Sequence, residues 1–466
     1  MSPTLAAGAR VLADAIPARG VEPAAALRAL AGPGSVLLES GEGRWSYLAP
    51  WPAAVLSRRD PAGALDEARV LLDRFAADVP AGAPPFTGGL IGSLGYDLVR
   101  ALEVIPQLAR DDLALPAIQL AAVDSLYAFD RARDELWVVA RAERELRRLR
   151  EGLERVRPVA APPAPGGELR GMPYAHYRAR VERVLDHIGR GDVYEVNYTQ
   201  RLEGNCASSL DLYARLRAGA PVPYNLYLDA GGWQLVGATP ETFLRVSSDG
   251  VCVTRPIKGT RPRGADPTRD AQLAYELQTS PKELAELVMI TDLLRNDLGK
   301  VCEFGSVQTP ELARLEKFAQ VQHLVSTVEG RLRKDMTHFA AFASCFPGGS
   351  ITGAPKFRAM EIIDELEPVS RGPYCGAIGY LGFNRESQLS ITIRTAVCKD
   401  GLAHFNVGAG IVADSNPEAE HEETLAKARG FFAALENGGS QPGDRPIFHK
   451  QSLRPGSQTT QFHKTK

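Results

Sequence analysis

Gly-Ala-Ile-Gly-Tyr-Leu-Gly-Phe, at residues 376–383, is a short apolar stretch that indicates a strand. Two further strand patterns follow it closely, at Ser390 to Val397 and at His404 to Ala409. Long helical patterns alternate with these strands, over Tyr174 to Arg190, Lys282 to Leu298 and Pro417 to Glu436. This half of the chain therefore mixes helices and strands.

The N-terminal part shows the same mixture. Ser35 to Glu39 and Leu136 to Ala140 indicate short strands, and helical patterns lie near residues 60–77 and 141–156. No regular alternation of strand, helix and strand is present. The pattern favours an α+β layout over a Rossmann sheet.

Proline and glycine mark the boundaries between these regions. Residues 79–85 predict a surface loop, and the Pro-rich run 158–167 predicts a stronger boundary, because proline and glycine disfavour both helix and sheet. We therefore divide the chain into an N-terminal region 1–157, a linker 158–170, a C-terminal region 171–437 and a tail 438–466. The tail has little to bury and is expected to be disordered.

Composition excludes several classes of function. The 466 residues carry 54 Lys and Arg against 56 Asp and Glu, so no net positive field attracts nucleic acid or anionic lipid. The six cysteines form no Cys-x-x-Cys pair, which favours reduced, mostly buried thiols over zinc. Neither a signal peptide nor a membrane-spanning apolar run is apparent. We expect a soluble cytoplasmic protein.

Two predicted helices each begin with a pair of glutamates spaced by three residues. Glu283 and Glu286 follow the cap Ser280, and Glu420 and Glu423 follow the cap Asn416. Each pair alone is explained by a capping box or by the helix dipole. Together, the two pairs supply the hard oxygen ligands that Mg²⁺ prefers.

Two glycine-containing segments also suggest sites. Residues 346–356 superficially resemble a phosphate loop, but Ala354 and Pro355 stand where such a loop needs backbone donors and a lysine. The alternative is a tight turn that presents backbone N–H groups to a carboxylate. Lys258 lies in Pro-Ile-Lys-Gly-Thr, at residues 256–260, where Gly259 allows close backbone approach. A solvated surface lysine is the alternative there.

Taken in order, these segments resemble the chorismate-utilising enzymes, a family that includes anthranilate, isochorismate, salicylate and aminodeoxychorismate synthases. The match runs from Tyr174 to Glu436. It includes residues 191–197, 238–241, 256–263, 292–297, 348–356, 378–380 and 408–427. The resemblance implies a large interwoven β-sandwich of mostly antiparallel sheets with helices packed outside, and it makes 171–437 the chorismate-binding catalytic region.

Position 258 separates activities within this family. The lysine resembles the large subunit of aminodeoxychorismate synthase, which makes 4-amino-4-deoxychorismate for para-aminobenzoate and folate synthesis, whereas anthranilate synthases carry alanine there. Isochorismate and salicylate synthases also carry a lysine, which activates water. These activities are the alternatives, together with a non-catalytic tryptophan-binding regulator. The sequence contains no Gly-x-Cys-x-Gly elbow, so a separate glutamine amidotransferase subunit is expected to supply ammonia.

The resemblance also implies roles for individual residues. Lys258 would be a covalent nucleophile that loses its proton through burial and nearby Mg²⁺, Glu241 an acid kept protonated by apolar neighbours, and His323 a support for the ring hydroxyl. A buried helical histidine is the alternative for His323. Glu286 and Glu423 would bind Mg²⁺ directly, with Glu283 and Glu420 acting through water. Substrate contacts are assigned to Tyr380, Arg394, Gly410, Lys427, Thr260 and Gly353.

The N-terminal region resembles the segment that binds tryptophan in anthranilate synthases. The candidate pocket residues are Leu37, Glu39, Ser40 and Tyr47. Such a pocket can be regulatory, structural or vestigial, and these side chains could equally belong to the core.

Overall fold

The computed structural model describes residues 10–160, 162, 169–219, 222–318 and 321–435. The predicted tail 438–466 and part of the predicted linker lie outside these residues. None of the described helices is both long and apolar enough to cross a membrane.

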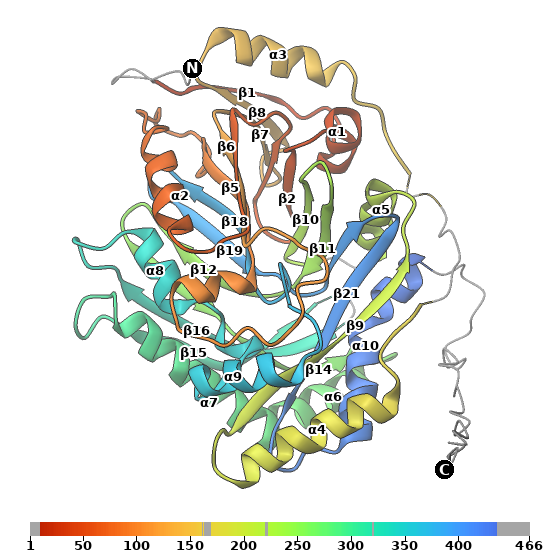
Figure 1. Ribbon diagram of the computed structural model, residues 1–466. Coiled ribbons are helices and arrows are strands. Elements are labelled where there is room, and N and C mark those ends of the chain that lie inside the picture. The colour runs from red at the N-terminus through yellow and green to blue at the C-terminus, as the bar shows by residue number, and fades with distance from the viewer. Residues whose placement is uncertain (1–9, 161, 163–168, 220–221, 319–320, 436–466) are drawn as a thin grey trace, which may run out of the picture.

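Two large antiparallel sheets form the centre of the molecule (Figure 1). The first contains, in spatial order, β1 (Leu12–Pro17), β8 (Glu135–Ala140), β7 (Ser125–Asp130), β3 (Trp45–Ala49), β2 (Val36–Ser40), β10 (Tyr224–Asp229), β11 (Gln234–Thr239), β20 (Thr395–Lys399), β21 (Leu402–Ile411), β9 (Glu195–Asn205) and β17 (Gly353–Ala354). The second contains β14 (Ile257–Pro262), β16 (Val321–Arg331), β13 (Val251–Arg255), β12 (Thr242–Val246), β19 (Ser387–Ile391), β18 (Ala377–Gly382), β5 (Gly89–Leu94), β6 (Ile118–Val123) and β4 (Ala54–Arg58), with β15 (Gln308–Lys317) beside β16.

Strands from both predicted regions share both sheets. Strand β2 pairs with β10 through Leu38 and Leu226, and β5 pairs with β18 through Ile91 and Tyr380. The N-terminal and C-terminal regions therefore form one interwoven body. This arrangement confirms the predicted α+β sandwich.

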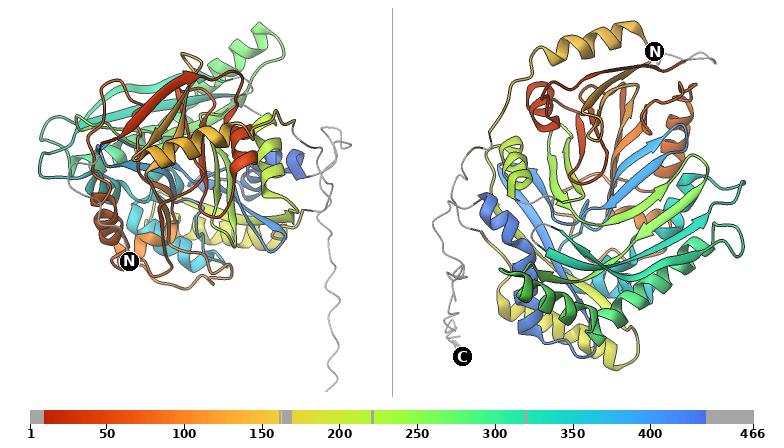
Figure 2. Two further views of the ribbon diagram at one scale, coloured as in Figure 1. Left: turned by 90° about the horizontal axis from the view of Figure 1, so that it is seen from above. Right: turned by 180° about the vertical axis from the view of Figure 1, so that it is seen from behind.

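The helices lie outside the sheets (Figure 1). They are α1 (Pro23–Leu30), α2 (Ala64–Asp73), α3 (Glu143–Leu153), α4 (Tyr174–Gly189), α5 (Ser209–Gly219), α6 (Pro267–Gln278), α7 (Pro281–Gly299), α8 (His338–Cys345), α9 (Lys356–Leu366) and α10 (Pro417–Leu435), with short 3₁₀ turns at Tyr96–Ala101 and Gly349–Ile351. Both Figure 1 and the rear view in Figure 2 show α4, α6, α7 and α10 gathered at the end of the molecule opposite α3. The helices with the glutamate pairs are thus neighbours.

One predicted strand is wrong in an informative way. The sequence predicted a single strand from Ser390 to Val397, but the chain leaves the second sheet after Ile391 and joins the first sheet at Thr395. Arg394 takes a left-handed backbone conformation at this crossing, with φ 51°. The strand breaks because its two halves belong to different sheets, and the break exposes the Arg394 side chain to the site.

Apolar side chains between the layers form the core. Fully buried examples are Leu37, Leu90, Tyr127 and Phe243. All six cysteines are free and buried, as expected. Burial of apolar surface stabilises a fold by roughly 25 cal/mol per Å², and it is the main force that holds the two sheets together.

Candidate active site

A cavity of about 490 Å³ opens between β14, β16, α7, β21 and α10. Most of the residues that the sequence singled out line it. They are Lys258, Glu241, His323, Thr260, Arg394, Gly410, Lys427, Glu283, Glu286, Glu420 and Glu423. Residues from distant parts of the chain thus converge on one space of the size that small-molecule sites usually have.

Local capping fixes the two helices that carry the glutamates. The Ser280 hydroxyl accepts a hydrogen bond from the Glu283 N–H at 3.4 Å, and Pro281 occupies the first turn of α7. The Asn416 side chain accepts hydrogen bonds from the N–H groups of Glu418 and Ala419 at 3.0 and 3.1 Å. The predicted caps are confirmed, and residues at both helix starts line the cavity.

Each of the four glutamates lies near a cation. The ion pairs are Glu283 with Arg261 at 3.2 Å, Glu286 with Lys258 at 3.6 Å, Glu420 with Lys282 at 3.7 Å and Glu423 with Lys427 at 2.7 Å. Among the described residues, no three acidic, histidine or cysteine side chains converge as a finished metal site. The donor set itself suits Mg²⁺, since four carboxylates from two helices face one cavity. The predicted metal stays a prediction.

Burial shifts the proton affinity of one of these glutamates. Burial raises the pKa of Glu286 to about 7, against the opposing effect of Lys258. The nearby carboxylates of Glu195 and Glu283 raise the pKa of Glu286 further, by smaller amounts than burial does. The cavity wall therefore favours a cation beside Glu286.

Lys258 is held between two carboxylates. Its Nζ donates a hydrogen bond to Glu195 Oε1 at 2.5 Å and lies 3.6 Å from Glu286 Oε2. Burial lowers the pKa of Lys258, but these carboxylates outweigh burial and raise the pKa above the ordinary lysine value. Glu195, which no local pattern places near Lys258, thus opposes the expected deprotonation, and the part expected of Mg²⁺ stays a prediction.

Gly410 makes room for this ion pair. A Cβ atom at Gly410 would lie 2.4 Å from Glu195 Oε1 and 3.3 Å from Lys258 Nζ. Any side chain there would displace the lysine or its partner. The substrate contact expected of Gly410 stays a prediction, and its lack of a side chain leaves space for Lys258 and Glu195.

Glu241 lies between β11 and β12, only 5 % exposed, and its Oε1 accepts a hydrogen bond from the Ser350 hydroxyl at 2.6 Å. Burial raises the pKa of Glu241 to about 7, more than the hydrogen bond from Ser350 lowers it. This direction agrees with the expectation that Glu241 holds a proton near neutral pH, and its role as an acid stays a prediction.

His323 lies on strand β16 rather than on a helix, so the helical alternative for this residue is wrong. Its Nδ1 lies 3.0 Å from the Thr260 hydroxyl and 3.2 Å from the Gly259 carbonyl oxygen. Burial lowers the pKa of His323, which keeps the ring neutral at pH 7. Thr260 and His323 together form a neutral polar wall.

Arg394 supplies an unpaired positive charge. It lies in the crossing between β19 and β20 and faces the cavity beside Ile393. Among the described residues, no carboxylate lies within ion-pair distance of its guanidinium. Burial lowers the pKa of Arg394, although not enough to neutralise an arginine. A planar anion is the natural partner for this group.

Two predicted substrate contacts lie elsewhere. Tyr380 packs at 5.3 Å against Tyr47 and at 4.5 Å against Phe86, between ring centres, and it lines a different, small cavity. Gly353 does not line the large cavity; a Cβ there would lie 2.1 Å from the Glu195 carbonyl oxygen, so this glycine lets β17 approach β9. Tyr374, which the sequence did not single out, lines the large cavity in place of Tyr380.

The candidate tryptophan residues surround little space. Glu39, Ser40 and Tyr47 line a cavity of only about 30 Å³, and Leu37 is fully buried in the core. Glu39 is already engaged, since it accepts hydrogen bonds from the Tyr213 hydroxyl at 2.5 Å and the Arg217 Nε at 2.8 Å. The packing favours the core alternative for these side chains, and a regulatory role stays untested.

Glu195 is the main functional candidate that sequence reasoning missed. It was quoted as part of the segment 191–197, without a role. Its side chain is 1 % exposed, and its Oε2 atom has no hydrogen-bond partner among the described residues. Its place at the start of β9, within the segment 191–197, was the available signal.

Comparison with known proteins agrees with this geometry. Residues 34–433 match the family of chorismate binding enzymes. The chain is 42 % identical to the anthranilate synthase component 1 of Streptomyces coelicolor over 89 % of this chain and 86 % of that protein, and 43 % identical to that of Thermus thermophilus over 80 % and 83 %.

Solved structures show the same relationship. The anthranilate synthase component I of Streptococcus pneumoniae superposes with a TM-score of 0.76 at 31 % identity, covering 89 % of this chain and 98 % of that one. The menaquinone-specific isochorismate synthase of Escherichia coli superposes with a TM-score of 0.71 at 19 % identity, which shows the fold alone.

Proposed function

Because this chain belongs to the chorismate-binding enzyme family, we propose that it is the large subunit of an aminodeoxychorismate synthase. It would convert chorismate and ammonia to 4-amino-4-deoxychorismate and water. The observation that carries this proposal is Lys258, whose amine lies in the wall of the cavity and 3.6 Å from Glu286.

The substrate is a dianion, and the cavity offers cations for it. The unpaired guanidinium of Arg394 would bind the carboxylate of the enolpyruvyl arm in the bidentate manner that arginine favours. Lys427 is the second cation, 2.8 Å from the Gly408 carbonyl oxygen. A bound Mg²⁺ would be held by Glu286 and Glu423, with Glu283 and Glu420 behind them, and would add positive charge for the ring carboxylate.

The reaction then needs a nucleophile and an acid. The neutral amine of Lys258 attacks C2, the ring double bond shifts, and the C4–O bond breaks. Glu241 gives its proton to the departing hydroxyl, which leaves as water. Ammonia forms the new bond at C4, the double bond shifts back, and the bond between Nζ and C2 breaks. The new ammonium group returns a proton to Glu241, so the residues end as they began.

Lys258 must be neutral for this step, and Glu195 and Glu286 oppose the loss of its proton. Neutralisation of either carboxylate would weaken that opposition. Burial raises the pKa of Glu286 to about 7, so this carboxylate takes up a proton near neutral pH. Lys258 therefore becomes nucleophilic only when a cation or proton occupies the Glu286 side of the cavity.

Anthranilate synthesis is the second candidate, since relatives of 38 to 43 % identity bear the name anthranilate synthase component 1. It uses the same substrate and the same nitrogen donor. Both candidates need ammonia, and the word component in the relatives' name supports a glutamine amidotransferase as partner. Lys258 is what leads us to favour amination at C4.

Product identification tests the proposal. The protein would be incubated with chorismate, MgCl₂ and ammonium chloride, and the products separated by chromatography with mass detection. We expect 4-amino-4-deoxychorismate from the wild type and from Lys334→Ala, an exposed-lysine control, and none from Lys258→Ala. Anthranilate from the wild type would support the second candidate. Isochorismate or salicylate formed without ammonium would contradict both.

A further inference from the structure

A buried arginine behind the large cavity joins three segments of the chain. Arg371 lies between α9 and β18 and is 4 % exposed. Its Nε and Nη2 atoms donate hydrogen bonds to the two carboxylate oxygens of Glu367, at 2.9 and 2.6 Å. Other N–H groups of the same fork donate to backbone carbonyl oxygens, from Nη1 to Ile351 at 2.8 Å and from Nη2 to Asn197 at 2.7 Å. The side chain therefore ties the end of α9 to the Gly349–Ile351 turn and to β9.

Glu367 completes this network. Its Oε1 atom also accepts hydrogen bonds from the Thr199 N–H at 3.1 Å and from the Thr199 hydroxyl at 2.8 Å. A buried ion pair adds little net stability compared with apolar side chains of the same volume, so stability alone does not account for the network. The fork of an arginine instead fixes direction, because it binds a carboxylate in a planar, bidentate arrangement.

The turn that Arg371 holds carries Ser350. The Ser350 hydroxyl donates a hydrogen bond to Glu241 Oε1 at 2.6 Å, and the next residue, Ile351, supplies the carbonyl oxygen that Arg371 binds. Ser350 is only half-buried, whereas Glu241 and Arg371 are both buried. The direction of the Ser350 hydroxyl thus depends on where the arginine fixes the turn.

The strand that Arg371 holds carries Glu195. Asn197, whose carbonyl oxygen binds the arginine, lies two residues after Glu195 on β9. Glu195 Oε1 in turn accepts the hydrogen bond from Lys258 Nζ. One guanidinium therefore stands behind the hydrogen-bond partners of both Glu241 and Lys258.

We propose that Arg371 is a positioning residue for the proposed reaction. Its fork holds the turn and the start of β9 at one fixed separation, so that the hydrogen-bond partners of Glu241 and Lys258 stay in place. Arg371 acts through these partners and does not itself line the large cavity. The inference rests on the proposed function, in which Glu241 gives a proton and Lys258 attacks the ring.

The proton affinity of Glu241 reports on this alignment. Burial raises the pKa of Glu241 to about 7, whereas the hydrogen bond from Ser350 lowers it, as do the charges of Lys258 on β14 and Lys427 on α10. Cys375, before β18, is a further titratable neighbour. If the turn loosens, the bond from Ser350 is lost and the pKa of Glu241 rises. Because Glu241 is active when protonated, the decline of kcat/KM with rising pH should then move to higher pH.

Arg371→Lys tests the role, because lysine keeps the charge beside Glu367 but lacks the fork. We expect kcat for chorismate consumption to fall about tenfold and the KM for chorismate to stay within about twofold of the wild type. The decline at high pH should move up by about 0.5–1 pH unit. Ser350→Ala should move it in the same direction, and the double variant should move it no further than Ser350→Ala alone.

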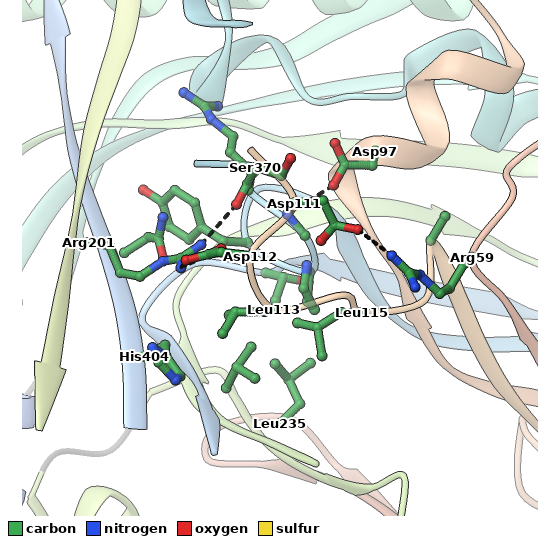
Figure 3. A pocket seen from close by; sticks show the side chains of 18 of the residues that line it. Arg59, Asp97, Asp111, Asp112, Leu113, Leu115, Arg201, Leu235, Ser370 and His404 are labelled. Carbon is green, nitrogen blue, oxygen red and sulfur yellow. Dashed lines mark hydrogen bonds and ion pairs between the residues drawn. The ribbon is translucent and has the colours of Figure 1, made fainter. Parts of the chain in front are cut away.

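Arg201→Lys is the matched control. Arg201 lies on β9 and binds Asp112 at 2.7 Å and the Ser370 carbonyl oxygen at 3.0 Å. Both arginines line another cavity, of about 460 Å³, where Figure 3 shows Arg201 beside Asp112 and Ser370. These bonds run to two loops rather than to the Gly349–Ile351 turn. Arg201→Lys should therefore lower the melting temperature and leave the pH profile unchanged.

A second variant, Arg371→Met combined with Glu367→Gln, serves if Arg371→Lys does not fold. It removes both charges, so no charged group of the pair stays buried without its partner. The same upward movement of the decline is expected.

The outcomes are distinguishable. An unchanged pH profile in the folded Arg371 variants, or an equal movement in Arg201→Lys, would overturn the positioning role. An unchanged profile in Ser350→Ala would overturn it even if no Arg371 variant folds. A wild type that consumes chorismate without forming an aminated product would overturn the proposed function instead, and the profiles of chorismate consumption would still decide the role of Arg371.

Discussion

The large cavity beside β14 and the small cavity beside β3 and β18 differ in both volume and charge. The first holds about 490 Å³ and contains Arg394, a cation without a partner among the described residues. The second holds about 30 Å³, and its one carboxylate, Glu39, is already bonded to Tyr213 and Arg217. Sequence motifs pointed to both places. Only the packing shows that one is ready for a ligand while the other is filled by aromatic rings.

The large cavity also contains ionisable side chains whose pKa values are shifted. In the large cavity, Glu241 and Glu286 have raised pKa values of about 7, and nearby carboxylates raise the pKa of Lys258 above its ordinary value. Perturbed groups that share a cleft mark functional sites more often than structural ones. The following predictions test whether function is confined to the large cavity.

The largest effect is expected for Glu241→Gln. Loss of the proton donor should lower kcat on the order of a thousandfold, with a small change in the KM for chorismate. In the wild type, kcat/KM should fall as pH rises through about 7, because the donor is active only in its protonated form. Steady-state kinetics from pH 5 to 9 would measure both effects.

Asp249→Asn is the control for that prediction, since Asp249 lies in an exposed turn and bonds the Ser247 hydroxyl. It should leave the rate and its pH profile unchanged. A Glu241→Gln variant that keeps the high-pH decline would show that another group gives the proton.

Arg394→Ala should have the next largest effect. A charge-assisted pair with a substrate carboxylate is worth about 1.5–3 kcal/mol, so the KM for chorismate should rise roughly ten- to a hundredfold. Titration calorimetry with chorismate and MgCl₂ would measure the loss of affinity directly. Arg331→Ala, on the far end of β16, is a control that should bind normally. Wild-type affinity in Arg394→Ala would contradict the anion site.

A smaller, but more specific, effect is expected for Glu195→Gln. The amide oxygen of the introduced glutamine still accepts a hydrogen bond from Lys258. It carries no negative charge to stabilise the Lys258 ammonium, so kcat should change while the KM for chorismate does not. In a double-mutant cycle with Lys258→Ala on the free energy of unfolding, the coupling energy should lie at about 0.5–3 kcal/mol, as for residues in contact. Strict additivity of the two substitutions would contradict a direct interaction between Glu195 and Lys258.

The sequence predicted well what depends on neighbours along the chain. Ser280 and Asn416 cap their helices through N–H groups two or three residues away, so the starts of α7 and α10, and the glutamates on them, were placed correctly. The break at Arg394 was not foreseen, because it arises where one strand passes between two sheets. No local pattern encodes which sheet a residue will join.

Long-range pairing also decided the misplaced and missed residues. Glu195 meets Lys258 across 63 positions of sequence, and neither segment shows that the other is near. Tyr380 faces the N-terminal strands because β18 pairs with β5, whereas Tyr374, in the turn before β18, faces the cavity. The sequence shows a tyrosine in a matching motif. The direction of its side chain depends on pairing with a strand nearly 290 residues earlier.

The smallest effect is expected for Tyr380→Phe, and it tests the comparison from the side of the small cavity. Tyr380 is 5 % exposed and packs between Tyr47 and Phe86, so removal of its hydroxyl should leave kcat and the KM for chorismate within about twofold of the wild type. A space of about 30 Å³ is far below the roughly 300 Å³ at which ligand pockets begin. Added tryptophan should therefore neither inhibit the wild type nor shift its melting temperature. Strong inhibition, lost in Tyr380→Phe, would mean that the aromatic rings open to admit a ligand, and the small cavity would then have to be counted as a second functional site.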